Sequence, residues 1–293
     1  MLTLTHAPVA TRTAWVDAGF GIAGDMFMAA LLDAGADIDF VRGNVVAVIG
    51  DAVRIDRSAV SRRGQRATMV DVRLVERDQP HRAWRDIRAL LEGAEIAEGV
   101  RAHSLAVFQR LAAAEARAQG IHADEVTFHE VGAWDCIADI VGVCAALEDL
   151  QVQRLYSSHV ALGEGVMHSH RCNHSEDEGT VHVGVHGVSA VPGSVALELL
   201  SGSHVAARAL PVGIHSTRGG TIGGDRPVGE LATMTGVALL TSLADGPAWG
   251  PDGLPSVAAV GVGAGHDDFP RWANVVRVVL GPVVEAVPGR HRH

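Results

Sequence analysis

The first half of the chain carries apolar residues at helical spacing. Between residues 100 and 119, Leu105, Phe108 and Leu111 form one stripe, and Gly120 then follows as a helix terminator. The same spacing predicts helices over residues 25–33, 81–92, 100–119 and 135–149. Short runs rich in β-branched residues predict strands over residues 13–17, 45–49 and 67–75.

The pattern changes beyond residue 150. Short Val-rich segments alternate there with Gly-rich loops, and residues 194–200 and 231–243 predict two further helices. Strands are expected over residues 257–262 and 275–280. We therefore predict an α+β fold with a mixed sheet, in which a helix-rich N-terminal half, 1–155, precedes a Gly-rich, strand-rich half, 156–293.

Charge and composition exclude several classes of protein. The net charge of -10 leaves no basic surface for nucleic acid or for an anionic membrane. The hydrophobic fraction of 47% predicts a folded chain, yet no apolar run is long enough to span a bilayer. The three cysteines are too few and too far apart for a disulfide framework, and Cys136 and Cys144 are expected in the core. Since the N-terminus also lacks a signal-peptide pattern, we expect a cytoplasmic protein.

A glycine-rich loop joins the first predicted strand to the first predicted helix. Gly19, Gly21 and Gly24 match the G-x-G-x-x-G pattern of dinucleotide-binding loops, and Asp51 lies near the position of a ribose-binding acid. A carboxylate at Asp25 would repel a pyrophosphate. The alternatives are a tight turn with Asp25 as helix N-cap, and a loop that binds the single phosphate of a mononucleotide.

A second polar segment precedes the helix predicted over residues 135–149. His129 and Glu130 stand just before a glycine, and Asp135 and Asp139 are four residues apart, so that both project from one helix face. An imidazole and three carboxylates bind a divalent cation or relay a proton in many proteins. The alternative is a helix cap at Asp135 and a solvated carboxylate at Asp139.

The middle of the chain is rich in histidine. Donors spaced two residues apart share one side of an extended chain, so a loop can fold them around one ion. Imidazole together with thiolate suits nickel, zinc or copper better than magnesium or calcium. The alternative is an exposed polar loop that binds metal only adventitiously. The predicted metal ligands here are His168, His170, Cys172, His174, His182 and His186.

Several segments together resemble a known family. They occur in family order and cover nearly the whole chain: Asp17-Ala-Gly-Phe-Gly-Ile-Ala-Gly24-Asp25-Met26, Phe128-His129-Glu130-Val131-Gly132-Ala133 with Asp135 and Asp139-Ile140-Val141-Gly142, Gly163-x-Gly165, His186-Gly187, Val191-Pro192, Gly229-Glu230-Leu231-Ala232-Thr233-Met234-Thr235-Gly236, Gly261-Val-Gly-Ala-Gly265 and Asn274-Val275. The combination resembles the nickel insertion proteins of lactate racemase maturation, the LarC family.

The resemblance implies a metal chelatase, a nickel insertion lyase. Its substrate would be a sulfur-bearing pyridinium mononucleotide, in which nickel becomes held by two sulfurs and a ring carbon. The family also implies CTP with Mg or Mn, hydrolysed during insertion. This chain departs from the pattern: Thr127 replaces a family histidine, residues 168–185 look inserted, and the sequence stops soon after Leu280, where longer members continue into a domain with the CTP site. We expect the metal-loading part of a split system, completed by a separate C-terminal-domain subunit, or a divergent relative.

Under this hypothesis each polar segment has a role. The His-rich loop collects nickel, and Gly19, Gly21, Gly24 and Asp25 bind the substrate phosphate. His129 or Glu130 accepts the ring proton as the nickel–carbon bond forms, while Asp135 and Asp139 orient the ion. Two alternatives remain open: a non-catalytic nickel-binding chaperone or storage protein, and a dinucleotide-binding enzyme. The sequence also leaves the oligomeric state open, with a homo-oligomer among the expectations.

Overall fold

The computed structural model describes residues 12–75, 81–129, 131–166, 183–184, 187–188, 190–208, 229–247, 256–269 and 272–283. Its helices are α1 (Gly24–Asp33), α2 (Ile38–Ile49), α3 (Trp84–Gly93), α4 (Glu98–Gln119), α5 (Trp134–Asp149), α6 (Ser194–Leu200) and α7 (Met234–Leu243), with short 3-10 turns at Gly50–Ala52 and Ala123–Glu125. None of these described helices combines the length and apolarity that crossing a bilayer requires.

A seven-stranded mixed sheet forms the centre of the fold. Its strands, in spatial order, are β14 (Gly246–Pro247), β6 (Val152–Ser157), β1 (Arg12–Asp17), β16 (Val275–Leu280), β15 (Ala259–Ala264), β3 (Gln65–Leu74) and β2 (Val53–Arg62). Strand β1 runs parallel to β6 and antiparallel to β16. The α+β class and the mixed sheet are therefore confirmed, and strands from both halves of the sequence share one sheet.

Smaller strand pairs lie outside this sheet. They comprise β4 (Arg82–Ala83) with β5 (Thr127–Phe128), β7 (Val160–Ala161) with β12 (Ala207–Arg208), β9 (Val183–Gly184) with β10 (Gly187–Val188), and β8 (Gly163–Val166) between β11 (Ala190–Val191) and β13 (Gly229–Glu230).

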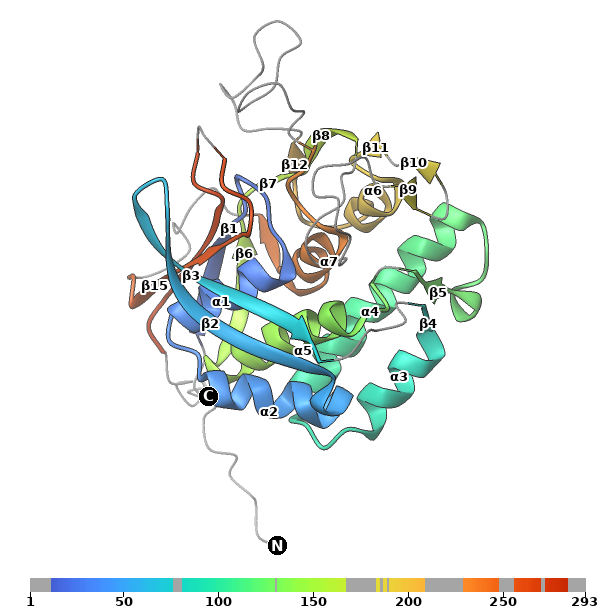
Figure 1. Ribbon diagram of the computed structural model, residues 1–293, viewed down its shortest axis with the longest axis horizontal. Coiled ribbons are helices and arrows are strands. Elements are labelled where there is room, and N and C mark those ends of the chain that lie inside the picture. Colours follow the sequence, from blue (N-terminus) through green and yellow to red (C-terminus); the bar gives the residue numbers. More distant parts are fainter. Residues whose placement is uncertain are drawn as a thin grey trace, which may run out of the picture.

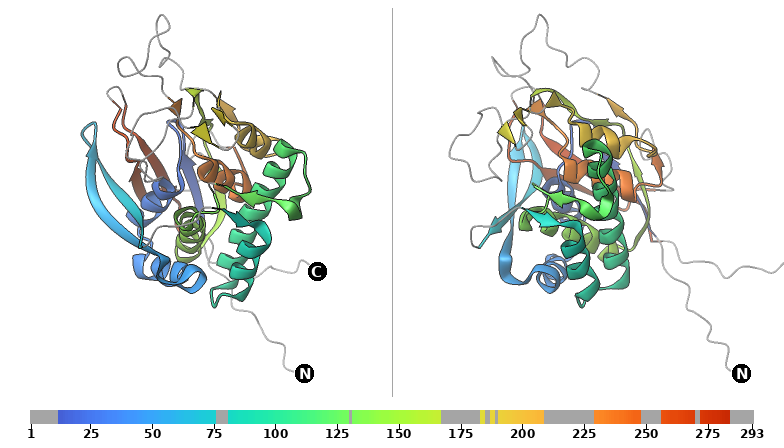
Figure 2. Two further views of the ribbon diagram at one scale, coloured as in Figure 1. Left: turned by 45° about the vertical axis from the view of Figure 1, so that its right-hand side comes forward. Right: turned by 90° about the vertical axis from the view of Figure 1, so that its right-hand side faces the viewer.

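The helices gather on one side of the sheet (Figures 1 and 2). Helix α1 packs directly on β15, β3 and β16, while α5 packs beside it and contacts α2 and α4. Two glycines of β15 let α1 come this close: a Cβ on Gly261 would lie 1.9 Å from the Ala30 carbonyl oxygen, and one on Gly263 would lie 1.9 Å from that of Met26. The start of α1, which follows the glycine loop, is thereby fixed against the sheet.

One predicted strand is wrong. Residues 45–49 belong to helix α2, because Val41, Val45, Val48 and Ile49 are buried at helical spacing. Asp37 caps this helix, since its side chain accepts a hydrogen bond from the Asp39 backbone N–H at 2.9 Å. Strands β2, β6 and β14 and the short strands outside the sheet were not predicted, whereas the other predicted helices and strands agree with the structure to within a few residues. The expected boundary near residue 155 falls inside β6 and stays a prediction.

Candidate functional site

The glycine loop is joined backbone to backbone to the segment that precedes α7. The Ile22 N–H donates to the Leu231 carbonyl at 3.0 Å, and the Thr233 N–H donates back to Ile22 at 3.0 Å. Gly21 has a positive φ of 107°, and a Cβ there would lie 2.0 Å from the Leu231 oxygen. The middle glycine is therefore required by this close approach of two backbones.

The two ends of the glycine loop differ in charge. A Cβ on Gly19 would lie 3.4 Å from Nη2 of Arg208, so a guanidinium stands beside that end. The same position is 3.0 Å from Oδ1 of Asp17, whose carboxylate is paired with Arg277. At the opposite end, a Cβ on Gly24 would lie 2.6 Å from Oδ2 of Asp139.

Asp25 lies in the first turn of α1. The helix begins at Gly24 and its N-cap is Ala23, which offers no side-chain cap, so the expectation of Asp25 as N-cap is wrong. Its Oδ1 accepts from the Met26 backbone N–H at 2.7 Å, and its Oδ2 lies 3.1 Å from Nδ1 of His266. Asp25 therefore joins the helix start to the loop that follows β15.

Asp139 is the most perturbed carboxyl group of the cluster that it forms with Asp25 and Asp135. Burial raises its pKa well above the ordinary value, and the negative charges of Asp25 and then Asp135 raise it further, against the lowering effect of a hydrogen bond from the Asp25 backbone N–H. Its buried Oδ1 has no hydrogen-bond partner among the described residues. Such a group is stabilised by a proton or by a cation.

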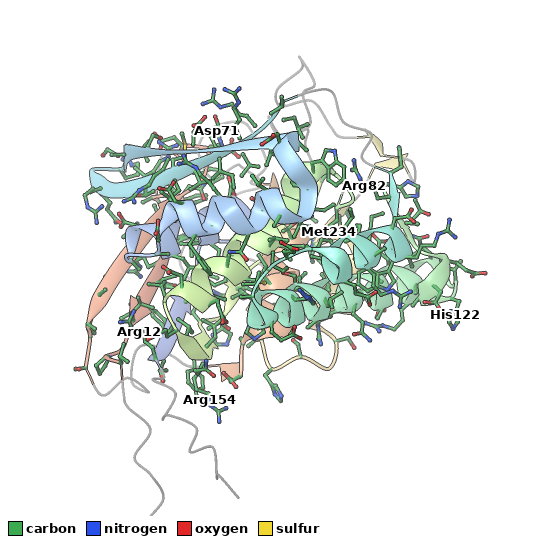
Figure 3. All side chains as sticks on the ribbon, turned by 90° about the horizontal axis from the view of Figure 1, so that it is seen from below. Arg12, Asp71, Arg82, His122, Arg154 and Met234 are labelled. Atoms are coloured by element: carbon green, nitrogen blue, oxygen red, sulfur yellow. The ribbon has the colours of Figure 1, made fainter. Side chains whose placement is uncertain are left out.

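His266 lies beside this group of carboxyl side chains. Its hydrogen bond with Asp25 raises its pKa, burial acts in the opposite direction, and the charges of Asp25, Asp71 and Asp267 add to the increase. Its Nε2 lies 4.0 Å from Oδ1 of Asp71, which is carried by the long strand pair β2–β3 (Figure 3). Across the described part of the chain, no group of three or more His, Cys, Asp or Glu side chains has an arrangement that would hold a metal ion as it stands.

A pair of imidazoles forms a separate feature. Nδ1 of His81 lies 2.7 Å from Nδ1 of His129, and the two rings meet edge to face. Next to them, the Arg82 guanidinium lies over the Trp134 ring at 3.4 Å from the ring centre and donates to the Gly132 carbonyl. His129 therefore contacts a residue 48 positions away in the chain.

Comparison with known proteins decides the family. The model of the nickel insertion protein family matches residues 14–292. The chain belongs to the nickel insertion protein family. No solved structure matches it significantly.

Curated relatives within the family agree. The pyridinium-3,5-bisthiocarboxylic acid mononucleotide nickel insertion protein of a Nocardioides species is 38% identical over 94% of this chain and 62% of its own length. Relatives described as nickel insertion proteins in Citrifermentans bemidjiense and Geobacter metallireducens are 34% and 37% identical, over 94% and 91% of this chain and 63% and 60% of their own lengths. The chain thus spans about three fifths of the length of these relatives.

The structure brings some predicted residues of this nickel insertion family member together. The charges of Asp25 and Asp135 both act on Asp139, and Gly24 contacts Asp139. Gly19, at the other end of the loop, stands beside Arg208 instead. The six predicted ligands of the His-rich loop and Glu130 lie outside the described residues, so those predictions stay open.

The cysteines near the site agree with their expected place in the core. Cys144 is fully buried, and burial raises the pKa of its thiol to about 12. Cys136 is half-buried and packs against the core cluster.

Sequence reasoning missed four residues near these features. They are Asp71, His81, Arg208 and His266. His266 directly follows the family-like segment Gly261–Gly265, which was the one available signal. The others are adjacent to the site only because strands and loops far apart in the sequence meet there.

Proposed function

We propose that the protein inserts nickel into pyridinium-3,5-bisthiocarboxylic acid mononucleotide. The observation that carries the proposal is the family match over residues 14–292, together with a relative of that name aligned over 94% of this chain. The chain spans about three fifths of that relative, so its activity and its substrate are both part of the proposal.

The chemistry requires a donor for nickel and an acceptor for one proton. Two nickel–sulfur bonds and one nickel–carbon bond form, one ring carbon–hydrogen bond breaks, and nickel remains Ni(II). The proton must therefore pass to a base, for which His129 and Glu130 are the proposed acceptors. Asp135 and Asp139 are proposed to orient the ion, and the His-rich loop to collect it.

The charges at the glycine loop support a substrate site in which the phosphate and the metal ion bind at opposite ends of the loop. At the Gly19 end the Asp17 carboxylate is already paired with Arg277, which leaves the Arg208 guanidinium to suit the substrate phosphate. The Gly24 end, beside Asp25 and Asp139, suits the cation, because an ion would neutralise carboxyl groups that now repel one another. The dinucleotide alternative loses support, since a pyrophosphate at the start of α1 would face those same carboxyl groups.

CTP fits the glycine loop poorly. A triphosphate there would meet the carboxyl groups of Asp25 and Asp139, and the Ile22 N–H already donates to Leu231. We therefore derive no step through CTP. The expectations of a separate C-terminal-domain subunit, a homo-oligomer and a cytoplasmic location remain predictions.

A transfer assay tests the proposed function. The untagged protein is loaded with Ni(II) and mixed with the mononucleotide, with and without CTP and Mg, and product is measured by the mass of the nickel complex. Replacing His129 and Glu130 together by alanine should reduce the rate about 100-fold or more, because a positioned base is lost. Asp139→Asn should raise the nickel concentration for half-maximal transfer about 10-fold or more.

Asp39→Asn is the matched control, because Asp39 is an exposed carboxylate on α2. Its transfer rate should equal that of the wild type. If the wild type binds nickel but transfers none, the proposal is overturned in favour of the chaperone or storage alternative. If the His129 and Glu130 double variant transfers normally, the assignment of the base is wrong.

A further inference from the structure

The short strand pair β4–β5 places two histidines opposite each other. Arg82 pairs with Phe128 and Ala83 with Thr127 in an antiparallel register. His81 precedes Arg82 and His129 follows Phe128, so the next position of the ladder is His81 opposite His129. Directly opposite residues in such a pair have Cβ atoms about 5 Å apart, which brings two side chains into contact.

The surrounding contacts hold this pair in place. The Trp84 N–H donates to the Val126 carbonyl at 3.0 Å, which extends the ladder beyond its two strands. On the other side, Arg82 reaches across to the Gly132 carbonyl and covers Trp134, the first residue of α5. The chain on both sides of His129 is therefore fixed relative to His81 before any ligand arrives.

We propose that His81 and His129 form a two-imidazole site that binds Ni(II) before the ion enters the substrate. The binding part of this inference stands on the geometry of the pair, and the transfer part rests on the proposed function.

The chemistry of the pair favours a transition ion. At 2.7 Å only one proton fits between the two Nδ1 atoms, so at least one imidazole directs a lone pair at the other. An ion about 2 Å from each nitrogen would replace that proton after the two rings separate slightly. Imidazole nitrogen is a suitable ligand for nickel, and the exposed His81 is open to ions from solution.

A nickel site with only two protein ligands suits transfer of the ion to the substrate. Nickel held by two imidazoles keeps coordination positions for the two sulfurs of the substrate, which can then draw the ion away. An open surface hollow lined by Arg82, Asp86, Ala89, Leu90 and Trp134 lies beside Arg82, the residue that follows His81. With His129 occupied as a ligand, Glu130 is the remaining proposed acceptor for the ring proton.

Site-specific labelling of histidine tests the inference in the full, untagged chain. Diethyl pyrocarbonate modifies imidazole nitrogens, and peptide mass spectrometry reports the modification at each histidine. Ni(II) is added in excess, so that the donors of the His-rich loop are saturated as well. We expect Ni(II) to reduce labelling of His81 and His129 several-fold. The exposed His122 should be labelled equally with and without the ion.

The variant His81→Ala distinguishes a shared site from two separate ones. In this variant Ni(II) should no longer protect His129, whereas the matched control His122→Ala should leave protection of both residues intact. Unchanged labelling of His81 and His129 at saturating Ni(II) would overturn the inference. Continued protection of His129 in His81→Ala would also overturn it, because His129 would then bind without its partner.

Transfer measurements separate this inference from the proposed function. His81→Ala should need roughly 10-fold or more nickel for half-maximal transfer and should approach the wild-type rate when nickel is saturating. A wild-type protein that shows protection but no transfer would overturn the proposed function and leave the binding site. Normal transfer without protection would overturn only the two-imidazole site.

Discussion

At the scale of single residues, close contacts leave little freedom around the carboxyl cluster. Gly24 begins α1, and its missing side chain makes room for Asp139 from α5. Sequence reasoning recognised both residues but assigned them to different features, a phosphate loop and a metal ligand. It could not foresee their contact, because the two residues are 115 positions apart and the packing of α1 against α5 leaves no local signal in the sequence.

Gly24→Ala should therefore be destabilising. A Cβ at this position would lie 2.6 Å from Cβ of Asp139, so α1 and α5 would have to move apart, at a cost of about 1–3 kcal/mol in the free energy of unfolding. The measurement is urea denaturation followed by circular dichroism.

Gly43→Ala is the matched control, since it also lies in a helix, α2, but a Cβ there would meet nothing within 4 Å. This substitution should stabilise the protein by about 0.5–1 kcal/mol through helix propensity. Equal effects of the two substitutions would contradict the tight contact between Gly24 and Asp139.

At the scale of elements, the end of α1 is joined to two strands through one carboxylate. Asp33 accepts hydrogen bonds from Thr68 of β3 at 2.9 Å and from the Val262 backbone N–H of β15 at 2.9 Å, and it pairs with Arg66. Partial burial acts to raise its pKa, but the hydrogen bonds from Arg66, Val262 and Thr68 outweigh burial and lower the pKa.

This arrangement predicts a pH dependence of stability. Because the folded-state pKa of Asp33 is below its unfolded value of about 3.9, the carboxylate stabilises the fold above that pH. The contribution is lost as the pH falls through the lower, folded-state pKa. Asp33→Asn should reduce the free energy of unfolding at pH 7 by about 1–3 kcal/mol and weaken its dependence on pH below about 4.

Urea titrations between pH 7 and pH 3 would measure the effect. Arg66→Ala is the control, because Arg66 is largely exposed and its ion pair is screened by solvent, so a much smaller loss is expected. Equal losses of stability in the two variants would mean that the contribution of Asp33 comes from its pairing with Arg66 and not from the hydrogen bonds donated by Thr68 and Val262.

Element types were predictable where one periodicity dominated. Helix α4 and strand β16 have clear patterns and were found nearly to the residue, 98–119 and 275–280. Helix α2 was read in part as a strand because Val45 and Val46 are β-branched neighbours, although only Val45 is buried. Strand β2 was missed because residues beyond Ile55 are mostly exposed, which removes the alternation that identifies a strand.

At the scale of the whole molecule, the family and the fold class were predictable, whereas the joining of the two halves was not. Sequence reasoning places a boundary near residue 155 because composition changes there. In the structure, β1 lies between β6 and β16, and β3 lies between β2 and β15. Pairing between distant strands leaves no local mark on composition, so the sequence alone does not reveal it, and the boundary near residue 155 stays a prediction.

A fragment of residues 1–155 should therefore not fold alone. It would lack β15, β16 and the last two residues of β6, so that β1 would have no complete neighbour and α1 would lose two of the three strands on which it packs. The buried faces of α1 and β1 would then be exposed to water, and cooperative folding requires them to be covered.

We expect the fragment to unfold in urea without a sharp transition, whereas the full chain unfolds in one step that circular dichroism and tryptophan fluorescence report at the same midpoint. Fluorescence is informative here because Trp15 and Trp84 belong to the first half and Trp272 to the second. A fragment with a sharp transition of its own would instead support an independent domain and make the mixed sheet a contact between two separately stable units.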